Sequence, residues 1–339
     1  MVALSILDLV PRSEGQDATA ALQASADLAV VADATGYRRL WYAEHHNTGV
    51  FLSSATALLI GRAAQLTERI RVGSGGVMLP NHPPLTVAEQ FGTLAAMYGD
   101  RIDLGLGRAP GTDPRTAALL RRGDSSEPAF AGEIAQLQAW FGDQRQLPVK
   151  AGPALNRHVP LWVLGSSTSG AMVAGQLGLP YAAASHFSPQ SLMDALAVYR
   201  QYFDPKAPTA QIDRPYAMAG VNVLVADTDE EAERQFTTHL QMARGIVRND
   251  RRALLPPDQD AVDSWDPYEL AMVRSRLTAS AVGSPATVRD QLDRFVGTTG
   301  VDELMTVTYT HDPAVRLRSV QLLAEAVRPT ADAAGTRAG

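Results

Sequence analysis

The sequence predicts an α/β protein, a (β/α)8 TIM barrel with an insertion before its last strand, and three observations lead to this prediction. Strand-like apolar runs alternate with helix-like segments along the whole chain. Eight strands can be counted, each followed by at least one helix, as in a TIM barrel. The length of 339 residues and the 45% share of hydrophobic residues suit one large barrel with a sizeable core.

The first strand–helix unit shows the signals used for every element. The run "LSILDL" is a short β-type stretch that ends before Pro11. In the first helix, Leu22, Ala26 and Val30 lie near a 3.6-residue period, and Gly36 stops it. By the same signals we expect strands over residues 4–9, 39–43, 69–75, 101–107, 160–165, 181–185, 217–226 and 302–309. The expected helices cover residues 17–34, 54–66, 86–98, 130–141, 171–177, 190–203, 230–241, 287–296 and 315–327, with one more near Thr116.

The main rival is a doubly wound open sheet, which binds a dinucleotide through G-x-G-x-x-G after its first strand. The segment "VPRSEGQD" at that place lacks the motif, and "GLGRAPG" follows the fourth strand and lacks the third glycine. We therefore expect a single barrel domain over residues 1–328 and a flexible tail of small, polar residues over 329–339. Residues 243–280 carry no strand signal and look like an insertion on the same barrel.

The composition excludes several classes of function. The formal net charge of −6 disfavours a nucleic-acid-binding protein, which usually carries a basic face. The absence of cysteine excludes disulfides, thiolate nucleophiles and iron–sulfur clusters. No apolar run is long enough to span a membrane, and no basic leader precedes the first apolar stretch, so we expect a cytoplasmic protein. The chain has no P-loop and no G-x-S-x-G elbow, which disfavours nucleotide hydrolysis and serine hydrolysis.

Polar residues gather where the expected strands end, and active sites of TIM barrels form at that end. Each of the second to sixth strands is followed by such residues. In chain order they are Glu44, His45 and His46; Asn81 and His82; Arg108; the loop 165–170; and His186.

The stretch "WYAEHHNTGV" places a carboxylate beside two histidines. Neighbouring residues of an extended chain point to opposite sides, so Glu44 and His46 are expected to face one way and His45 the other. This alternation, and the absence of H-x-H and H-E-x-x-H, disfavour a metal site. Histidine titrates near neutral pH, which would suit His45 to proton handling. The alternative is that His45 and His46 satisfy loop backbone groups.

The loop "GSSTSG", residues 165–170, indicates an anion site. Small residues let backbone N–H groups approach an anion, and the following helix N-terminus adds partial positive charge. Arg108 could reach the same anion or a ring system. The alternatives are an ordinary helix-capping turn and, for Arg108, a salt bridge with Asp103 or Asp113.

The segment "VGSGGVMLPNHPP" has three glycines in four residues. Such glycines often mark a bulge or a place where a ligand approaches the backbone, and a flat ring stacked against the backbone would explain them. The alternative is an irregular turn before the two prolines, and beside them His82 is expected to be structural.

Three stretches resemble the bacterial-luciferase-like family of flavin-dependent monooxygenases, in particular its single-chain group-one oxidoreductases. They are "LWYAEHHN", "RIRVGSGGVMLPNHPPLTVAEQFGTLAAMYGDRIDLGLGRAPGTD" and "VPLWVLGSSTSGAMVAGQLGLPYAAASHF". The resemblance runs from the first strand to about Val327 and is strongest in the first 190 residues.

The resemblance implies a role for individual residues. The family's active-site histidine falls on His45, and its flavin-contacting arginine falls on Arg108. The phosphate-binding loop falls on Gly165, Ser166, Ser167 and Gly170, and a non-prolyl cis peptide falls on Gly75–Gly76, which would support the flavin ring. Glu44, Asn81 and His186 would line the substrate pocket, and residues 243–280 would cover the substrate as a lid.

The implied activity is that of an FMN-dependent monooxygenase. Reduced FMN from a separate flavin reductase and O2 would oxygenate a carbonyl or aromatic, polyketide-like substrate of secondary metabolism through a C4a-peroxyflavin. Gly107 stands where luciferase has a reactive cysteine, which argues against light emission as the role. We expect a homodimer in contact through barrel helices two and three. The alternatives are an F420-dependent hydride-transfer oxidoreductase and a non-catalytic flavin-binding protein.

Overall fold

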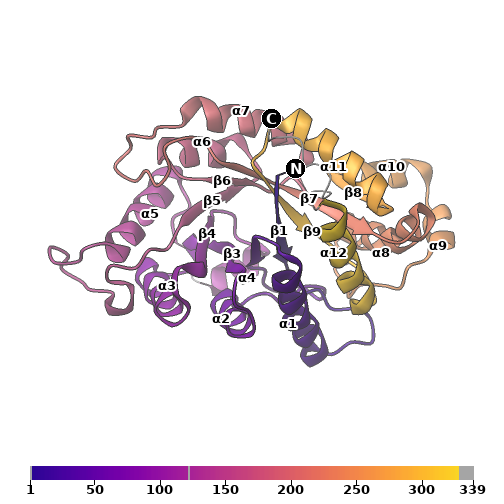
Figure 1. Ribbon diagram of the computed structural model, residues 1–339, viewed down its shortest axis with the longest axis horizontal. Coiled ribbons are helices and arrows are strands. Elements are labelled where there is room, and N and C mark those ends of the chain that lie inside the picture. The colour runs from indigo at the N-terminus through magenta and orange to yellow at the C-terminus, as the bar shows by residue number, and fades with distance from the viewer. Residues whose placement is uncertain (1, 121–122, 328–339) are drawn as a thin grey trace, which may run out of the picture.

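The fold is a closed parallel barrel surrounded by helices, seen in a computed structural model that describes residues 2–120 and 123–327. The tail predicted over residues 329–339 lies outside the described residues. The barrel strands are β1 (Ala3–Asp8), β2 (Arg39–Tyr42), β3 (Arg71–Met78), β4 (Ile102–Gly107), β5 (Leu161–Gly165), β6 (Tyr181–Ala183), β7 (Ala217–Val225) and β9 (Glu303–Val307). They pair in this order, and β9 returns to β1, which closes the barrel and confirms the predicted fold class (Figure 1).

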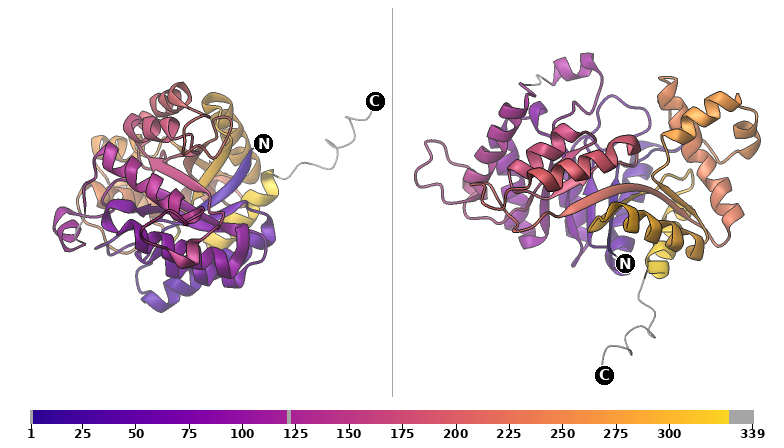
Figure 2. Two further views of the ribbon diagram at one scale, coloured as in Figure 1. Left: turned by 90° about the vertical axis from the view of Figure 1, so that its left-hand side faces the viewer. Right: turned by 90° about the horizontal axis from the view of Figure 1, so that it is seen from above.

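The helices that connect the strands form an outer ring (Figure 2). They are α1 (Ala18–Thr35), α2 (Thr56–Leu66), α3 (Pro84–Tyr98), α4 (Pro114–Leu119), α5 (Glu127–Phe141), α6 (Thr168–Gln176), α7 (Leu192–Tyr202), α8 (Asp229–Val247), α11 (Pro285–Thr299) and α12 (Pro313–Val327). The caps explain their limits, as α1 illustrates. The Asp17 carboxylate accepts a hydrogen bond from the Ala20 N–H, and Gly36 ends the helix in the left-handed conformation that glycine adopts without steric cost.

One strand was missed by the sequence prediction. Strand β8 (Ser280–Gly283) pairs with Asn222–Val225, the carboxyl-terminal half of β7, beyond the stretch that pairs with β6. It lies outside the barrel wall. Four residues with only two apolar side chains are too short to show a periodicity, so only the pairing with β7 reveals the strand.

The insertion before the last barrel strand is helical and packed. Helix α8 continues to Val247, six residues beyond its predicted end, and α9 (Gln259–Asp263) and α10 (Pro267–Ser275) follow it. These three helices form a lobe at one side of the barrel (Figures 1 and 2). Phe236, Trp265 and Val273 belong to a separate apolar core of this lobe.

A strand-to-strand connection anchors the insertion to the barrel. The buried Leu254 forms an isolated bridge with Ser13 after β1, where its N–H donates to the Arg12 carbonyl (2.9 Å) and its carbonyl accepts from the Glu14 N–H (2.8 Å). The segment that follows α8 is therefore held across the end of the barrel where the strands β1 and β2 finish.

The opposite end of the barrel is closed by a buried ionic network. Arg39 donates to Asp103 (2.6 Å) and to Glu303 (3.0 Å), and Arg71 also pairs with Asp103 (2.6 Å). Tyr216 donates to the second oxygen of Glu303 (2.8 Å). Because both carboxylates are fully buried, these partners are needed to offset the cost of removing the charges from water.

Candidate active site

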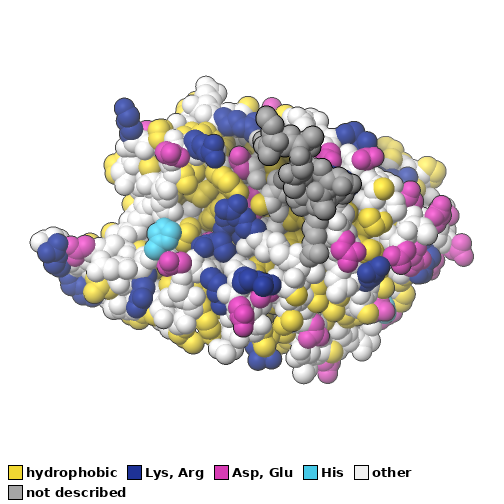
Figure 3. Space-filling model, in the orientation of Figure 1, with side chains coloured by type: hydrophobic (Ala, Val, Ile, Leu, Met, Phe, Trp, Pro, Cys, Tyr) yellow, Lys and Arg dark blue, Asp and Glu magenta, His cyan; other side chains and the backbone are white. Residues whose placement is uncertain are grey.

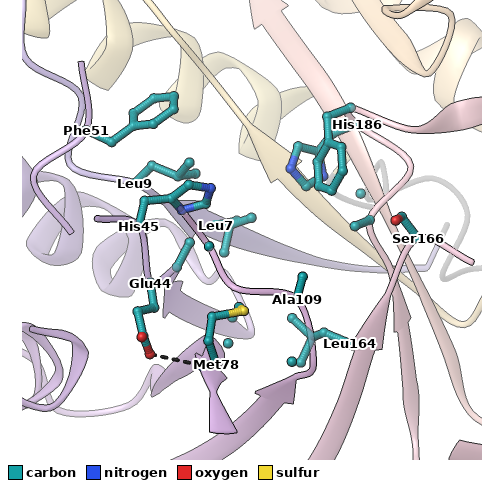
Figure 4. A pocket seen from close by; sticks show the side chains of 18 of the residues that line it. Leu7, Leu9, Glu44, His45, Phe51, Met78, Ala109, Leu164, Ser166 and His186 are labelled. Carbon is teal, nitrogen blue, oxygen red and sulfur yellow. Dashed lines mark hydrogen bonds between the residues drawn. The ribbon is translucent and has the colours of Figure 1, made fainter. Parts of the chain in front are cut away.

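A cavity of about 800 Å³ opens at the carboxyl ends of the barrel strands. It collects most of the site residues that the sequence predicted, from five different strand ends. These are Glu44, His45, Gly75, Gly76, Arg108, Gly165, Ser166, Ser167, Gly170 and His186. Apolar side chains such as Leu7, Phe51 and Leu164 make up much of the remaining wall (Figure 4).

The imidazole of His45 projects into this cavity (Figure 4). Its backbone N–H donates to the Ser53 carbonyl (2.9 Å), and its ring packs edge-on against Phe51 with centroids 5.7 Å apart. Its Nδ1 atom is buried without a hydrogen-bond partner among the described residues. The ring is therefore held by packing, and Nε2 is the ring atom left to meet a ligand.

The electrostatic environment keeps His45 neutral. Burial lowers the pKa of His45 to about 4, and the positive charge of Arg251 acts in the same direction. This differs from the near-neutral pKa used in the sequence argument. At pH 7 the imidazole is a neutral donor or acceptor of a hydrogen bond, and it can accept a proton more readily than it can supply one.

Glu44 points away from His45 and holds the loops behind it (Figure 4). Its carboxylate bonds His46 Nε2 (2.9 Å), His82 Nε2 (2.9 Å), Asn81 Nδ2 (3.0 Å) and the Met78 N–H (2.9 Å). Burial alone would raise the pKa of Glu44. The hydrogen bond and charge of His82, and the hydrogen bonds of His46 and Asn81, have a larger combined effect and lower the pKa of Glu44. The predicted alternation of Glu44 and His46 against His45 is confirmed, and His82 is structural as expected.

Asn81 occupies a different place from the one predicted. It does not line the cavity; its side-chain amide donates to Glu44 and to the Pro110 carbonyl (3.1 Å) instead. Residues Leu79–Asn81 form a short 3-10 helix after β3 that turns the amide toward Glu44, which sequence spacing does not show. Within the described part of the chain, no three His, Asp or Glu residues are grouped so that they could hold a metal ion.

The peptide bond between Gly75 and Gly76 is cis, as the resemblance implied. Both glycines line the cavity. Both are also required by packing, since a Cβ atom would lie 2.6 Å from Leu7 Cδ1 at Gly75 and 2.7 Å from the Gly105 carbonyl oxygen at Gly76. Packing within the barrel wall therefore favours glycine at these two positions, in addition to their place at the cavity.

The N-terminus of α6 is a suitable anion site. Ser167 is the N-cap residue, yet its side chain makes no capping hydrogen bond, so the first-turn N–H groups and this hydroxyl face the cavity end uncapped. The Arg108 guanidinium lies beside them and donates to Ser169 Oγ (2.6 Å). Arg108 also forms an ion pair with Glu127 (3.5 Å), so the partners suggested by sequence, Asp103 and Asp113, were wrong.

Sequence reasoning missed several polar residues of the cavity. Asn222 and His239 line it with His186, and burial lowers the pKa of both histidines to about 3. Asn222 Nδ2 donates to the His186 carbonyl (2.7 Å), whereas Asn222 Oδ1 and His186 Nδ1 are buried without partners in the described residues. Asn222 is a strand residue and His239 lies in the middle of a helix, so neither stands at a strand end, the signal used to find the others.

The comparisons with known proteins agree with this geometry. The profile of the luciferase-like monooxygenase family matches residues 2–303, and the chain belongs to that family. A luciferase-like monooxygenase of Escherichia coli (strain K12) is 44% identical over 323 residues, which cover 95% of this chain and 96% of the relative. N-acetyl-S-alkylcysteine monooxygenase of Bacillus subtilis (strain 168) is 30% identical over 338 residues and covers 96% of this chain and 98% of its own. The crystal structure of apo-MsnO8 has a TM-score of 0.90 at 40% identity, with 97% of this chain and 100% of that chain covered.

More distant structures share the fold alone. The oxygenating constituent of 3,6-diketocamphane monooxygenase from Pseudomonas putida, in complex with FMN, has a TM-score of 0.73 at 18% identity and covers 96% of this chain and 98% of its own. An F420-dependent secondary alcohol dehydrogenase has a TM-score of 0.67 at 15% identity, and the match covers 97% of this chain and 99% of that chain. Both structures share the barrel fold of this chain.

Proposed function

We propose that this luciferase-like monooxygenase uses reduced FMN and O2 to oxygenate a small organic substrate, a carbonyl or aromatic compound. The observation that carries this proposal is the division of the cavity. An uncapped helix N-terminus with Arg108 lies at one end, and the neutral imidazole of His45 lies in the interior. The membership of the family, whose profile spans residues 2–303, supports a monooxygenase.

The residues present fit FMN. The first turn of α6, with the hydroxyls of Ser166 and Ser167 and the guanidinium of Arg108, would hold the phosphate. The cavity of about 800 Å³ has room for a tricyclic ring and a substrate together. When bound, reduced FMN supplies the electrons that activate O2.

The protein's own residues position the reactants and exclude water. His45 Nε2 exchanges a proton or hydrogen bond with the reacting group, and the apolar wall around it, including Phe51, keeps water away. Glu44 acts behind the wall, because it fixes the backbone at Met78 and the loop that carries His46. His186 and Asn222 line the part of the cavity where a substrate would lie.

Two alternatives are kept because the same barrel serves them. An F420-dependent hydride-transfer oxidoreductase is supported by the shared fold of F420 enzymes and by basic residues near the cavity mouth. A non-catalytic flavin-binding protein would hold FMN without consuming O2. We favour FMN because the two monooxygenases described above are 44% and 30% identical in sequence to this chain, whereas the F420-dependent dehydrogenase is 15% identical.

We further propose that the protein is a homodimer supplied by a separate flavin reductase. The face formed by α2 and α3 exposes large apolar side chains, with Leu58 at 76% and Met97 at 64% exposure. Such residues on neighbouring helices suit a contact between two copies.

The proposed activity is tested with the protein, a flavin reductase, NADH, FMN and a panel of ketones and phenols. Mass spectrometry with ¹⁸O2 should find a product that gains one labelled oxygen atom. FMN that binds without a labelled product from any substrate would favour the flavin-binding alternative, and tight binding of F420 with no FMN binding would favour the hydride-transfer alternative.

The place of the phosphate is tested by Arg108→Ala. Loss of one charge-assisted contact should weaken FMN binding by about tenfold or more in a fluorescence titration. Arg145, an exposed arginine paired with Asp143, provides the control, and Arg145→Ala should leave FMN binding unchanged. An unaltered titration for Arg108→Ala would reject this anchor.

A further inference from the structure

The main cavity is more positive than the protein that surrounds it. The chain carries a net charge of −6, yet the described residues that line the cavity include three arginines, Arg108, Arg251 and Arg276, and one carboxylate, Glu44. The Glu44 carboxylate is already held by His46 and by other donors. Of the three arginines, only Arg108 would contact the coenzyme phosphate proposed above. The presence of Arg251 and Arg276 in the lining remains to be explained.

These two arginines come from different parts of the insertion, and both line the cavity. Arg251 follows α8, and its carbonyl oxygen would lie 2.7 Å from a Cβ atom on Gly49, so its backbone packs against the loop that follows His45. Arg276 follows α10, where Gln190 after β6 donates to the Ser275 carbonyl (3.0 Å). Both side chains are exposed at the cavity mouth.

Two carboxylates of the insertion, Glu269 and Asp250, are engaged with other arginines. Glu269 pairs with Arg244 (2.8 Å) and with Arg248, and Asp250 pairs with Arg252. Over residues 2–120 and 123–327, neither Arg251 nor Arg276 forms an ion pair. Glu269 and Asp250 therefore pair with Arg244, Arg248 and Arg252, and not with the two arginines at the cavity.

The charge of Arg251 also reaches the reaction centre. After burial itself, it is the largest influence that lowers the pKa of His45. A long-range attraction for anions at this mouth would therefore bring a ligand close to the imidazole.

From these observations we propose that Arg251 and Arg276 bind a carboxylate group of the organic substrate at the cavity mouth. The inference rests on the proposed function and narrows its substrate to an acid. The planar guanidinium fork matches a carboxylate in geometry and charge. The apolar side chains of Met242, Ile246 and Leu277 lie beside the arginines in the lining, so the bound acid would have an apolar body.

A carboxylate at the cavity mouth could also belong to a coenzyme and not to the substrate. The oligoglutamate tail of F420 also carries carboxylates, and it would leave the cavity through the same mouth. The phosphate of FMN is a poorer match, because the arginine pair lacks the backbone N–H groups that α6 presents at the other end. The substrate is the source to which the proposal commits, and the experiment separates the two.

The experiment compares two probes of equal shape, 4-phenylbutanoate and 4-phenylbutanamide, by calorimetric titration with and without FMN. The wild-type protein should bind the acid at least about fivefold more tightly than the amide. The double variant Arg251→Gln/Arg276→Gln should lose this preference while its affinity for FMN stays within about twofold. The matched control is Arg252→Gln, one residue further along, which pairs with Asp250 and does not line the main cavity.

Equal binding of the two probes by the wild-type protein would overturn the proposal, as would a preference that survives in the double variant. Weaker FMN binding in the double variant would assign the arginines to the coenzyme and overturn it as well. F420 is also compared with its deazaflavin that lacks the oligoglutamate tail. If F420 binds more tightly than this compound, and the difference disappears in the double variant, the arginines bind the coenzyme tail and the proposal that they bind the substrate is overturned. Because the probe titration needs no turnover, a protein that prefers the acid but never binds FMN would contradict the proposed function and leave this inference standing.

Discussion

At the scale of single residues, the role proposed for His45 depends on its protonation state. Its Nδ1 atom is buried without a hydrogen-bond partner among the described residues, and burial lowers the pKa of the imidazole to about 4. The imidazole therefore enters any reaction at neutral pH as a base or as a neutral hydrogen-bonding group. His186, whose pKa is lowered to about 3, is neutral at pH 7 as well.

Replacement of His45 by alanine should lower turnover by about 10²–10⁴-fold, the usual contribution of one proton-handling side chain. FMN binding should change by less than about twofold, because the phosphate contacts are proposed to come from α6 and Arg108. Steady-state rates and a flavin titration measure the two effects. His158 is exposed and away from the cavity, so His158→Ala is the control. Unchanged turnover in His45→Ala would end the role assigned to this residue.

Sequence reasoning located residues well where local geometry decides, and less well where tertiary contacts decide. The period of two in an extended chain was enough to separate Glu44 and His46 from His45. The place of Asn81 depends on a short 3-10 turn and on the Pro110 carbonyl, which lies 29 positions away. Arg251 and Arg276 could not be found, because the insertion that carries them reaches the cavity through long-range packing, on the loop after β1 near Arg251 and on Gln190 after β6 near Arg276.

At the scale of elements, the barrel strands and the helices that connect them were predicted, whereas β8, α9 and α10 were not. All eight barrel strands stand at their expected places. Strand β8 and the last six residues of α8 depend on neighbours, since β8 is held by its pairing with β7 and the end of α8 by the ion pairs of Arg244 with Glu269. Contacts of this kind are long-range and leave no local periodicity.

Two helical glycines provide a test of packing at this scale. A Cβ atom on Gly92 in α3 would lie 2.5 Å from the Ala154 Cα atom, whereas Gly132 in α5 has nothing within 4 Å. Alanine is favoured over glycine in helices by about 1 kcal/mol, so Gly132→Ala should stabilise the protein slightly. Gly92→Ala should destabilise it by about 1–3 kcal/mol, because the backbone across the contact must move. Urea denaturation of both variants checks the opposite signs; two stabilised variants would contradict the packing described here.

At the scale of the whole molecule, charge is arranged by position in the barrel. The ionic network of Arg39, Asp103 and Glu303 closes the amino-terminal end, and two arginines of the insertion, Arg251 and Arg276, line the cavity at the other end. On the face drawn in Figure 3, basic and acidic side chains are interspersed, with a group of basic side chains near its centre. No helix among the described residues is long and apolar enough to cross a bilayer.

Acidification should destabilise the fold through its buried histidines. The pKa of His45 is lowered to about 4, and those of His186 and His239 to about 3, against about 6.5 in an unfolded chain. At a pH between the folded and unfolded pKa values, the unfolded state binds more protons than the folded state. The free energy of unfolding therefore keeps its full value above pH 6.5 and decreases as the pH falls toward 4. The loss should be about 1 kcal/mol per histidine per pH unit. Urea titrations at pH 7, 6 and 5 measure it, and His239→Gln should remove about a third of the slope. Equal stability at pH 7 and pH 5 would contradict this account.

The proposed dimer is tested by charge on the face of α2 and α3. The double variant Leu58→Glu/Met97→Glu should be monomeric in light scattering, because two copies would face each other with four buried carboxylates. Leu119 is even more exposed, at 84%, but belongs to α4 and to neither helix of the proposed contact, so Leu119→Glu should leave the mass unchanged. A wild-type protein that is already monomeric would reject the dimer.

The anchoring of Leu254 between Arg12 and Glu14 has a kinetic consequence. Because the backbone that carries Arg251 is fastened to the loop after β1, the ligand path does not depend on releasing that segment from the barrel. Exposed side chains at the rim, such as Phe187 and Ile246, can rotate within picoseconds to nanoseconds. We therefore expect association rates to be set by diffusion and orientation, in the ordinary range of about 10⁵–10⁷ M⁻¹s⁻¹ or above, with no slow unimolecular phase in stopped-flow traces.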